Sequence, residues 1–513
     1  MLEVRPKETA SMLTRDGVRL DADIYRPTGD GEFPVLLMRQ PYGRAIASTV
    51  VYAHPKWYAA RGYIVVVQDV RGRGTSEGEF KLFAAEIEDG LDAVNWAAKL
   101  PGSNGKVGMY GFSYQGMTQL YAASAKPEAL KTICPAMVGY DLYGDWAYEG
   151  GAFCLQANLG WAIQLAAETA RLRGDEKAYQ ALYSASRNLP FYDNIPARPE
   201  IITKLAADSF YGEWLDNYLP GEYWQKLSPN MALVDLPMLH IGGWFDTYLR
   251  GTIHFYREMA SGRECLQHLI VGPWAHLPWG RKVGAIDYGL AALSPIDELQ
   301  IEWFDRFLKG IDNGLLNKAP VCLFEMGSDR WREFDNWPSG EEKSYFLAST
   351  GLASIREDAG SLNEDLSENS SEDILIRDPW RPVPSLGGHA AFPAGSFERS
   401  GLDNRSDILT YTSAFLKEDL HIAGDVEIEI YCTADAPSFD LCAILSEVKN
   451  DGRVYNFTQG YRRVDSKELP VKISLQATCI KVAKGNALRL SLSADCFPAY
   501  AANGGTGKPA GET

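Results

Sequence analysis

The first third of the chain alternates short apolar runs with segments of helical periodicity. Residues 34–38 and 63–68 are almost wholly apolar, which is typical of strands buried on both faces of a parallel sheet. Residues 18–25 alternate polar and apolar side chains, which predicts a half-buried strand. Apolar residues recur at helical spacing over 87–98, before another apolar run at 107–110. This strand–helix–strand order predicts right-handed crossovers and a mostly parallel sheet.

The pattern changes at about residue 140. Residues 140–230 carry Trp, Tyr, Ala and Leu at helical spacing and show no strand signal, which predicts a helical insertion. Apolar runs return at 236–242 and 266–272 and predict two more buried strands. A strong helix is predicted over 294–310, with Ser294 as its N-cap, a proline at its first position and a glycine at its end.

From about residue 318 onward, apolar and polar residues alternate with a period of two. Residues 426–432 and 488–493 are clear examples, and glycine and proline turns separate such runs. This pattern predicts an antiparallel β-sandwich of jelly-roll type. The polar stretch 352–372 predicts a long exposed loop, and the glycine-rich residues 502–513 predict a frayed tail.

The changes of pattern divide the chain into domains. A chain of 513 residues is too long for a single hydrophobic core, so more than one domain is expected. We predict an α/β core formed by residues 1–139 and 231–317, a helical cap at 140–230 and a C-terminal jelly-roll sandwich at 318–513.

Composition and charge exclude several classes of partner. The chain carries 50 basic and 67 acidic side chains, a formal charge of −17. No basic excess is present to release counterions, which argues against nucleic acid and against an anionic membrane as partner. No stretch approaches 18 apolar residues and the first residues lack a signal-peptide core, so we expect neither a membrane span nor export.

The cysteines and the ligand motifs bear on the cellular compartment and on cofactors. The eight cysteines are scattered and form no Cys-x-x-Cys pair. We therefore expect free thiols in a reducing compartment, which predicts a cytoplasmic protein. The sequence contains neither a nucleotide-binding glycine loop nor a metal-ligand cluster, so we expect no cofactor and no metal.

The strongest chemical signal is Ser113 in the segment Gly-Phe-Ser-Tyr-Gln-Gly. The segment joins a predicted strand to a predicted helix over 114–125, as in a nucleophile elbow. Gly111 and Gly116 flank the serine, but the second glycine comes one residue later than in the usual Gly-x-Ser-x-Gly pattern. The alternative is an ordinary serine N-cap after a glycine turn.

A nucleophilic serine needs a base and an acid that orients the base. Asp246 and His276 each follow a predicted buried strand by a few residues, and both come after Ser113 in the order expected for this kind of fold. Taken singly, such an aspartate could be a helix cap and such a histidine could be a solvated loop residue. Taken together with Ser113, in order and at strand ends, they predict a catalytic triad.

The oxyanion that forms in such a reaction needs two hydrogen-bond donors. The backbone N–H of Tyr114 is the first candidate, because it follows the serine at the start of a helix. The loop after an early strand reads Arg-Gln-Pro-Tyr-Gly, so the phenol of Tyr42 is the second candidate. From the residues alone, Tyr42 could equally be a tyrosine that packs at a Pro-Tyr-Gly turn.

Several motifs together resemble one family, that of the cocaine esterases, the glutaryl-cephalosporin and α-amino-acid ester acylases and the Xaa-Pro dipeptidyl-peptidases. The matching segments span nearly the whole chain. They are Pro-Tyr-Gly at 41–43, Asp-Val-Arg-Gly-Arg-Gly-Thr-Ser-Glu-Gly at 69–78, Gly-Phe-Ser-Tyr-Gln-Gly at 111–116, Gly-Trp-Phe-Asp at 243–246, Gly-Pro-Trp-Ala-His at 272–276, and Asp-Pro at 378–379 through Pro-Ser-Leu-Gly-Gly at 384–388.

This resemblance implies an α/β-hydrolase core, a helical cap and a C-terminal jelly roll. It implies that Ser113 is the nucleophile, His276 the base and Asp246 the orienting acid, and it favours Tyr42 as an oxyanion donor. It also implies an acyl pocket lined from all three domains. The matching aromatic residues are Trp146, Trp161, Tyr248 and Phe392, which could otherwise be core aromatics.

The chain departs from its amine-binding relatives. The α-amino-acid ester hydrolases carry an acidic pair just after the triad aspartate, whereas this chain has Thr247, Tyr248 and Leu249 there. This disfavours an amino-bearing acyl group, although Asp145 or Glu149 could still bind one.

We therefore predict a serine hydrolase that cleaves carboxylic esters or amides of small molecules through an acyl-enzyme. The first alternative is a peptidase or acylase that recognises a free amine. The second is a non-catalytic binding protein that uses the jelly roll. The sequence predicts no particular oligomeric state.

Overall fold

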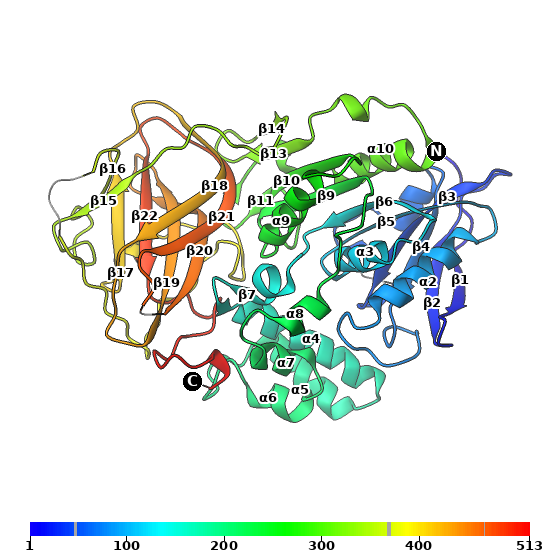
Figure 1. The fold of residues 1–513 in the computed structure, drawn as a ribbon, viewed down its shortest axis with the longest axis horizontal. Helices are drawn as coiled ribbons and strands as arrows, with labels where there is room; N and C mark the ends of the chain where they lie inside the picture. The colour runs from blue at the N-terminus through cyan, green and yellow to red at the C-terminus, as the bar shows by residue number, and fades with distance from the viewer. Residues whose placement is uncertain (46–48, 367–370, 466, 513) are drawn as a thin grey trace.

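The computed structural model describes residues 1–45, 49–366, 371–465 and 467–512. Three parts are visible in Figure 1: a sheet flanked by helices at one end, a β-sandwich at the other end, and a group of helices below the region where the two meet. These correspond to the α/β core, the sandwich and the helical cap expected from the sequence.

A ten-stranded sheet forms the core, and its central strands are parallel, as predicted. The strand order is β1-β2-β4-β3-β5-β6-β9-β10-β13-β14, with antiparallel pairs only at the two edges. The bounds are β1 Glu8–Leu13, β2 Arg19–Tyr25, β3 Phe33–Gln40, β4 Ile64–Asp69, β5 Ser103–Phe112, β6 Leu130–Ala136, β9 Met238–Phe245, β10 Gln267–Ala275, β13 Val321–Glu325 and β14 Arg330–Phe334.

Helices cover both faces of this sheet because its strands are apolar on both sides. Val35 and Leu37 pack into the cluster that contains α2 and α3, whereas Leu36 and Met38 pack against α1 and α10. The bounds are α1 Pro55–Ala59, α2 Glu86–Ala98, α3 Tyr114–Ser124, α9 Leu249–Ala260 and α10 Ile296–Lys309.

Two local predictions for the core need correction. Strand β2 is buried on both faces rather than half-buried, because Asp21 and Asp23 point into ion pairs with Arg19, Lys7 and Arg44. Helix α10 starts one residue later than predicted, with the proline as N-cap and the preceding serine side chain accepting a 3.4 Å hydrogen bond from the first helical N–H. Its predicted end is confirmed by a left-handed glycine at the C-cap.

The cap is helical, as predicted, but it also contains a small hairpin. Strands β7 (Tyr148–Glu149) and β8 (Ala152–Phe153) pair around two glycines with positive φ. A Cβ on Gly150 would lie 2.0 Å from the backbone oxygen of Tyr461 in the sandwich, so glycine permits this close approach. The helical elements are η2 Leu142–Ala147, α4 Leu155–Leu172, α5 Glu176–Arg187, α6 Glu200–Leu205, α7 Phe210–Asp216 and α8 Glu222–Leu227.

The C-terminal part is a β-sandwich, as predicted. A six-stranded sheet has the order β15-β16-β17-β22-β19-β20, and β18 pairs with β21. Side chains from both sheets share one apolar cluster. The bounds are β15 Phe346–Ser349, β16 Gly360–Asn363, β17 Ile408–Ser413, β18 Leu420–Ile430, β19 Ser438–Val448, β20 Val454–Asp465, β21 Val471–Val482 and β22 Ala487–Ser493, with a short helix α11 at Ser400–Asp403.

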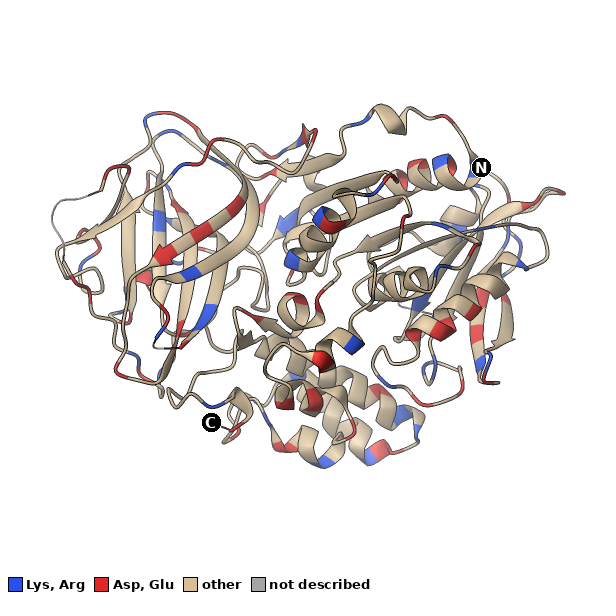
Figure 2. Cartoon of the chain, in the orientation of Figure 1, with Lys and Arg blue, Asp and Glu red and all other residues tan. Residues whose placement is uncertain are grey.

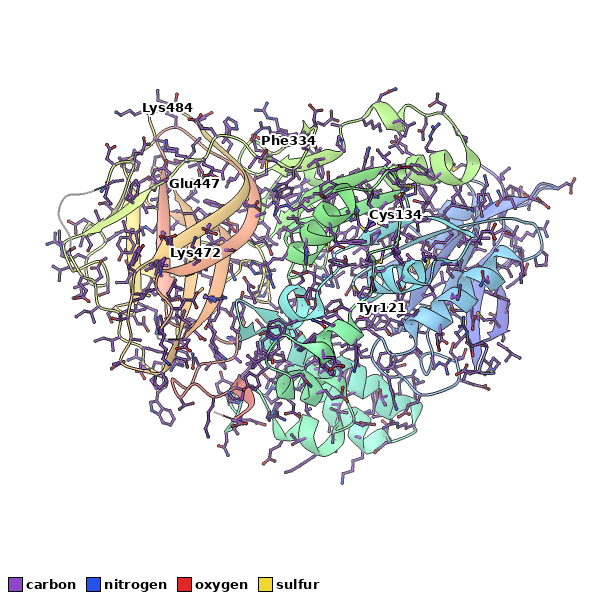
Figure 3. All side chains as sticks on the ribbon, viewed as in Figure 1. Tyr121, Cys134, Phe334, Glu447, Lys472 and Lys484 are labelled. Carbon is purple, nitrogen blue, oxygen red and sulfur yellow. The ribbon has the colours of Figure 1, made fainter. Side chains whose placement is uncertain are left out.

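The core sheet extends past the predicted boundary at residue 318. Strand β13 pairs in parallel with β10, and β14 adds an antiparallel edge that ends at Phe334. Phe334 is labelled in Figure 3, between the core and the sandwich. We propose that the C-terminal domain starts after this residue, because the hydrogen bonds of β13 and β14 belong to the core sheet.

Two polar segments are more ordered than predicted. Residues 352–372 contain β16 and bury Ala353 and Leu362, so the exposed-loop prediction is wrong there; residues 367–370 lie outside the described part. The tail 502–513 is not frayed over its described residues, because Asn503 and Ala510 are buried; Thr513 is not described.

Acidic and basic side chains are interspersed over the molecule, with several acidic positions along β18 (Figure 2). Lys472 on β21 lies 3.4 Å from Glu429 and 3.8 Å from Glu427, so part of this acidic row is compensated. Among the helices of the described residues, none is long and apolar enough to cross a membrane. All eight cysteines are free thiols, five of them buried.

Candidate active site

Ser113 sits on a strained turn between β5 and α3. Its φ of 59° and ψ of −126° lie in a region that side-chain-bearing residues rarely adopt. The backbone N–H of Ser113 donates a 2.9 Å hydrogen bond to the carbonyl of Ala136 at the end of β6, which holds the turn in place. This is the strand–turn–helix geometry that the elbow motif predicts.

The packing around the turn explains why the second glycine comes late. A Cβ on Gly116 would lie 2.5 Å from Val138 Cγ1 and 2.9 Å from the carbonyl oxygen of Ala136. A Cβ on Gly111 would lie 2.5 Å from the Cβ of Gln115. Helix α3 therefore makes its closest contact with β6 and the loop after it at position 116, and glycine is required there.

His276 and Asp246 meet at the same edge of the sheet. Asp246 directly follows β9, His276 directly follows β10, and the Nδ1 of His276 lies 2.7 Å from Oδ1 of Asp246. Asp246 is fully buried, and the ring of His276 lies 5.5 Å from the ring of Phe112, the residue before Ser113. The structure thus joins His276 to Asp246 and places the ring of His276 against the residue that precedes Ser113.

Tyr42 also reaches this place, from the loop after β3. Its hydroxyl accepts a 3.1 Å hydrogen bond from the indole nitrogen of Trp161, and it lies near enough to Ser113 for the serine hydroxyl to lower its pKa. Burial raises the pKa of Tyr42 to about 12, so the phenol is protonated at neutral pH and is able to donate a hydrogen bond.

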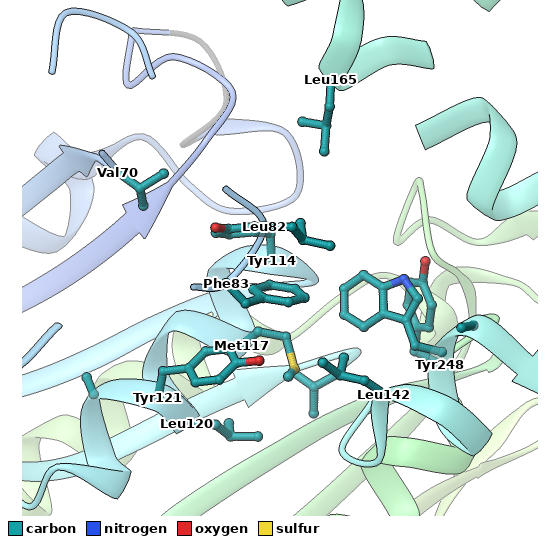
Figure 4. Close-up of a cluster of buried hydrophobic side chains, with 14 of the residues drawn as sticks. Val70, Leu82, Phe83, Tyr114, Met117, Leu120, Tyr121, Leu142, Leu165 and Tyr248 are labelled. Atoms are coloured by element: carbon teal, nitrogen blue, oxygen red, sulfur yellow. The ribbon is translucent and has the colours of Figure 1, made fainter. Parts of the chain in front are cut away.

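Tyr114 is held by its side chain beneath the elbow. Its phenol donates a 2.8 Å hydrogen bond to Glu86 on α2, which is paired with the buried Arg39 at 2.6 Å. Its ring stacks on Phe83 with centroids 4.7 Å apart, and both rings are visible in Figure 4. As the first residue of α3, Tyr114 has a backbone N–H with no acceptor inside the helix.

Three of the four predicted pocket residues form one aromatic wall. Trp146 lies 5.2 Å from Trp161 and 4.2 Å from Tyr248, and Tyr248 lies 5.0 Å from the ring of His276. Tyr248 is labelled in Figure 4 at the edge of this buried cluster. The wall therefore runs from the cap to His276.

Phe392 lies apart from this wall. It is 52% exposed and lines a separate cavity of about 340 Å³ that also touches His276. The structure therefore separates the predicted pocket residues into an aromatic wall and a cavity at Phe392, both of which contact His276.

Arg73 lies in the glycine-rich segment 69–78 and is a site residue that the sequence did not lead us to expect. Arg73 is buried, its guanidinium lies 3.8 Å from the centre of the Phe80 ring, and Nη1 donates to the carbonyl of Leu165 on α4. It forms no ion pair within the described part of the chain. The available signal was an arginine in a turn directly after a buried strand.

Within the described ranges, no group of three or more His, Cys, Asp or Glu side chains is placed to hold a metal ion.

Comparison with known proteins decides the family. The model of the X-Pro dipeptidyl-peptidase (S15) family matches residues 16–278, and that of the X-Pro dipeptidyl-peptidase C-terminal non-catalytic domain matches residues 313–513. The chain belongs to the S15 family.

A curated S15-type relative is the cocaine esterase of Rhodococcus sp. (strain MB1 Bresler). The two are 31% identical over an alignment that covers 96% of this chain and 91% of the relative. Together with the family match, this makes the chain a serine hydrolase that acts on esters or amides, and the alternative of a non-catalytic binding protein is not supported.

Two solved structures share the fold of this S15-family chain. An aminopeptidase from the marine sediment archaeon Thaumarchaeota archaeon superposes with a TM-score of 0.80 at 23% identity, over 98% of this chain and 91% of that one. An α-amino acid ester hydrolase superposes with a TM-score of 0.76 at 22% identity, with the same coverage. At these identities the likeness concerns the fold alone.

Within this S15-family site, the two acidic residues that could bind an amine are already paired. Asp145 lies 2.9 Å from Nδ1 of His254. Glu149 is buried and accepts hydrogen bonds from Arg250 at 2.8 Å and from Tyr500 at 2.5 Å, with His389 2.9 Å away. Burial favours the neutral carboxyl, but Arg250 and His389 outweigh it, so the pKa of Glu149 falls to about 2.

Proposed function

We propose that this chain hydrolyses carboxylic esters of small molecules with Ser113 as nucleophile. His276 takes the proton of the Ser113 hydroxyl as that oxygen attacks the carbonyl carbon. Asp246 holds the imidazole in the correct orientation and stabilises its protonated form. The Tyr42 hydroxyl and the Tyr114 N–H donate hydrogen bonds to the oxyanion.

The second half of the reaction uses the same groups. The protonated His276 gives its proton to the leaving alcohol, or to the amine if the substrate is an amide, and an acyl-enzyme remains on Ser113. Water then attacks the acyl carbon while His276 acts as base again, and the free acid leaves.

The observation that carries this proposal is the hydrogen bond of 2.7 Å between His276 and the buried Asp246, beside a serine on a strained elbow. A histidine that packed only as a loop residue would not need a fully buried carboxylate partner. The position of the Tyr42 hydroxyl near Ser113 further supports a donor next to the nucleophile.

The aromatic wall supports a substrate with a bulky, mainly apolar acyl group. Trp146, Trp161 and Tyr248 form a rigid apolar surface that ends at His276, and His276 also lines the cavity that contains Phe392. A relative that is a cocaine esterase is consistent with aromatic acyl groups.

The competing proposal is a peptidase or acylase that recognises a free amine, as the family description suggests. The existing partners of the two carboxylates argue against this proposal. An incoming ammonium would have to displace His254 from Asp145 or Arg250 from Glu149. A comparison of kcat/KM between a p-nitrophenyl acyl ester and an Ala-Pro anilide separates the two proposals. We expect the ester to be preferred by several orders of magnitude, whereas a preference for the anilide would favour the peptidase.

The direct test of the triad is Ser113→Ala. We expect kcat on an activated ester to fall by a factor of about 10⁵–10⁶, as in other triad knockouts. Ser124→Ala, at the other end of α3, is the matched control and should retain full activity, because among the described residues the Ser124 hydroxyl bonds only to the carbonyl of Tyr121. Hydrolysis or fluorophosphonate labelling retained in Ser113→Ala would refute the assignment.

A further inference from the structure

A side chain of the cap touches the proposed oxyanion donor. Trp161 lies in the first half of α4, and its Nε1 donates a 3.1 Å hydrogen bond to the hydroxyl oxygen of Tyr42 in the core. No other hydrogen bond of the Trp161 indole to a side chain is present among the described residues. This contact joins the helical insertion to the loop that follows β3.

The contact restricts the direction of the Tyr42 hydroxyl proton. An indole N–H is only a donor, so the Tyr42 oxygen must accept from Trp161. The phenol proton then has to point away from the indole, and the hydroxyl of Ser113 lies near the Tyr42 oxygen. Accepting one hydrogen bond also polarises the O–H bond and strengthens the hydrogen bond that it donates.

The indole is held firmly enough to act in this way. Its ring packs against Trp146 at 5.2 Å and against Phe210 of α7 at 5.0 Å, and its environment includes Trp214 at 6.3 Å. Large aromatic neighbours on several sides leave few alternative rotamers for Trp161.

A second contact of the same helix lies one turn further on. Arg73 donates from Nη1 to the carbonyl of Leu165, which places an unpaired buried cation on the Tyr42 side of α4. Its charge favours the ionised phenol of Tyr42 and thus opposes part of the effect of burial. The hydrogen bond from Trp161 and the charge of Arg73 therefore both favour negative charge at the Tyr42 oxygen.

We propose that Trp161 is a positioning residue, which orients the Tyr42 hydroxyl toward the oxyanion so that the cap completes the oxyanion hole. This inference rests on the proposed function, because it requires Tyr42 to be an oxyanion donor. It assigns to Trp161 a role in kcat that is distinct from lining the acyl pocket.

The two roles predict different kinetics. A wall residue contacts the acyl group in the ground state as well as in the transition state, so its loss acts mainly on KM and grows with acyl size. A positioning residue acts through Tyr42, so its loss lowers kcat even for an acetyl ester and has no further effect once the Tyr42 hydroxyl is gone.

A double-mutant cycle with p-nitrophenyl acetate tests this. We expect Tyr42→Phe to lower kcat by about 10²–10³ and Trp161→Phe to lower it by about tenfold, the value of one ordinary hydrogen bond. The double variant should be no slower than Tyr42→Phe alone, because Trp161 then has no hydroxyl to orient.

Trp146→Phe is the matched control. The Trp146 indole is buried next to Trp161, and its nitrogen has no hydrogen-bond partner among the described residues. The substitution therefore removes a similar volume without removing a hydrogen bond to Tyr42. Whatever effect it has on kcat should multiply with that of Tyr42→Phe.

Three results would overturn the inference. One is a tenfold effect of Trp161→Phe that persists in the Tyr42→Phe background. Another is a change in KM alone. The third is a Tyr42→Phe variant with full kcat, which would also remove the oxyanion role on which the inference rests, whereas loss of activity in Ser113→Ala would still support the proposed nucleophile.

Discussion

Gly116 stands one residue later than the second glycine of the usual elbow pattern, and the contacts of α3 give the reason. The Cβ of any other residue at this position would meet Val138 and the Ala136 carbonyl at distances that real Cβ atoms do not show. The position of the second glycine is thus set by the close contact of α3 with the end of β6, and not only by the turn at Ser113.

Gly116→Ala should therefore destabilise the fold. We expect the free energy of unfolding to fall by about 1–3 kcal/mol, the usual range for overpacking, and kcat to fall because α3 carries the Tyr114 N–H. Thermal unfolding and ester hydrolysis measure the two effects. Gly212→Ala is the control: it lies in α7 with open space around it and should leave both unchanged or raise stability slightly.

Arg73 is a residue where activity and stability oppose each other. A buried cation without an ion-pair partner in the described ranges is costly to fold, and burial lowers the pKa of Arg73 to about 10. The same charge favours negative charge at Tyr42.

We expect Arg73→Met to lower kcat severalfold while the unfolding temperature stays the same or rises. Methionine fills most of the space, and its uncharged side chain removes the cost of burying a cation. Steady-state kinetics and calorimetry on one preparation check both halves. An Arg73→Met variant with normal kcat and a lowered unfolding temperature would show that Arg73 has only a structural role.

At the scale of single elements, helix α10 shows how local signals set an end. Gly310 has a φ of 72° and serves as its C-cap, with its N–H directed back to the carbonyl of Asp305. At the other end the expected serine cap is displaced by one residue, because the proline takes the N-cap position. The C-terminal end of α10 requires a left-handed backbone conformation, and glycine, which adopts it readily, stands at that position.

Gly310→Ala should cost about 1 kcal/mol of unfolding free energy. No atom lies near the added methyl group, so the cost comes only from placing a side chain at positive φ. Urea unfolding measures it. Gly401→Ala is the comparison, because that glycine also has open space but lies in a short helix without positive φ, and it should show no comparable loss. Equal losses in both variants would contradict the explanation.

At the scale of the whole molecule, three parts of the chain meet at Glu149. The carboxyl lies on β7 of the cap, Arg250 comes from α9 of the core, and His389 and Tyr500 come from the C-terminal part. The junction is buried and charged, so each partner depends on the others. It lies close to the site, since the hydroxyl of Thr247, next to Asp246, donates to the carbonyl of His389.

Glu149→Gln should destabilise the protein by about 3–5 kcal/mol at neutral pH, because it leaves Arg250 buried beside a neutral group. The folded-state pKa of Glu149, about 2, is below its ordinary value of 4.5. Its contribution is therefore fully present above about pH 4.5 and is lost as the pH falls toward 2. The difference in unfolding midpoint between wild type and Glu149→Gln should become smaller as the pH falls from about 4.5 toward 2.

Glu222→Gln is the control for this experiment. Glu222 forms an exposed pair with Lys226 one turn along α8, so its loss should change the midpoint little at any pH. A difference between wild type and Glu149→Gln that stayed constant from pH 5 to about pH 2 would contradict the assigned pKa.

Much of the fold could be predicted because its signals are local. Apolar runs of strand length, helical periodicity and glycine or proline at helix ends depend on neighbouring residues, so the parallel core, the cap and the sandwich were all expected. The missed end of the core sheet has its cause in long-range pairing. Strand β13 looks like any short apolar strand, and only its hydrogen bonds to β10 assign it to the core.

By itself, the sequence determined the order of elements, the elbow around Ser113 and the residue types of the predicted triad, because each is written in contiguous motifs. Only the tertiary structure decided what these residues touch. It brought His276 to Asp246, separated Phe392 from the aromatic wall and placed Trp161 against Tyr42. The two contacting pairs are 30 and 119 positions apart, and such contacts depend on how sheets and helices pack, which no local pattern of side chains specifies.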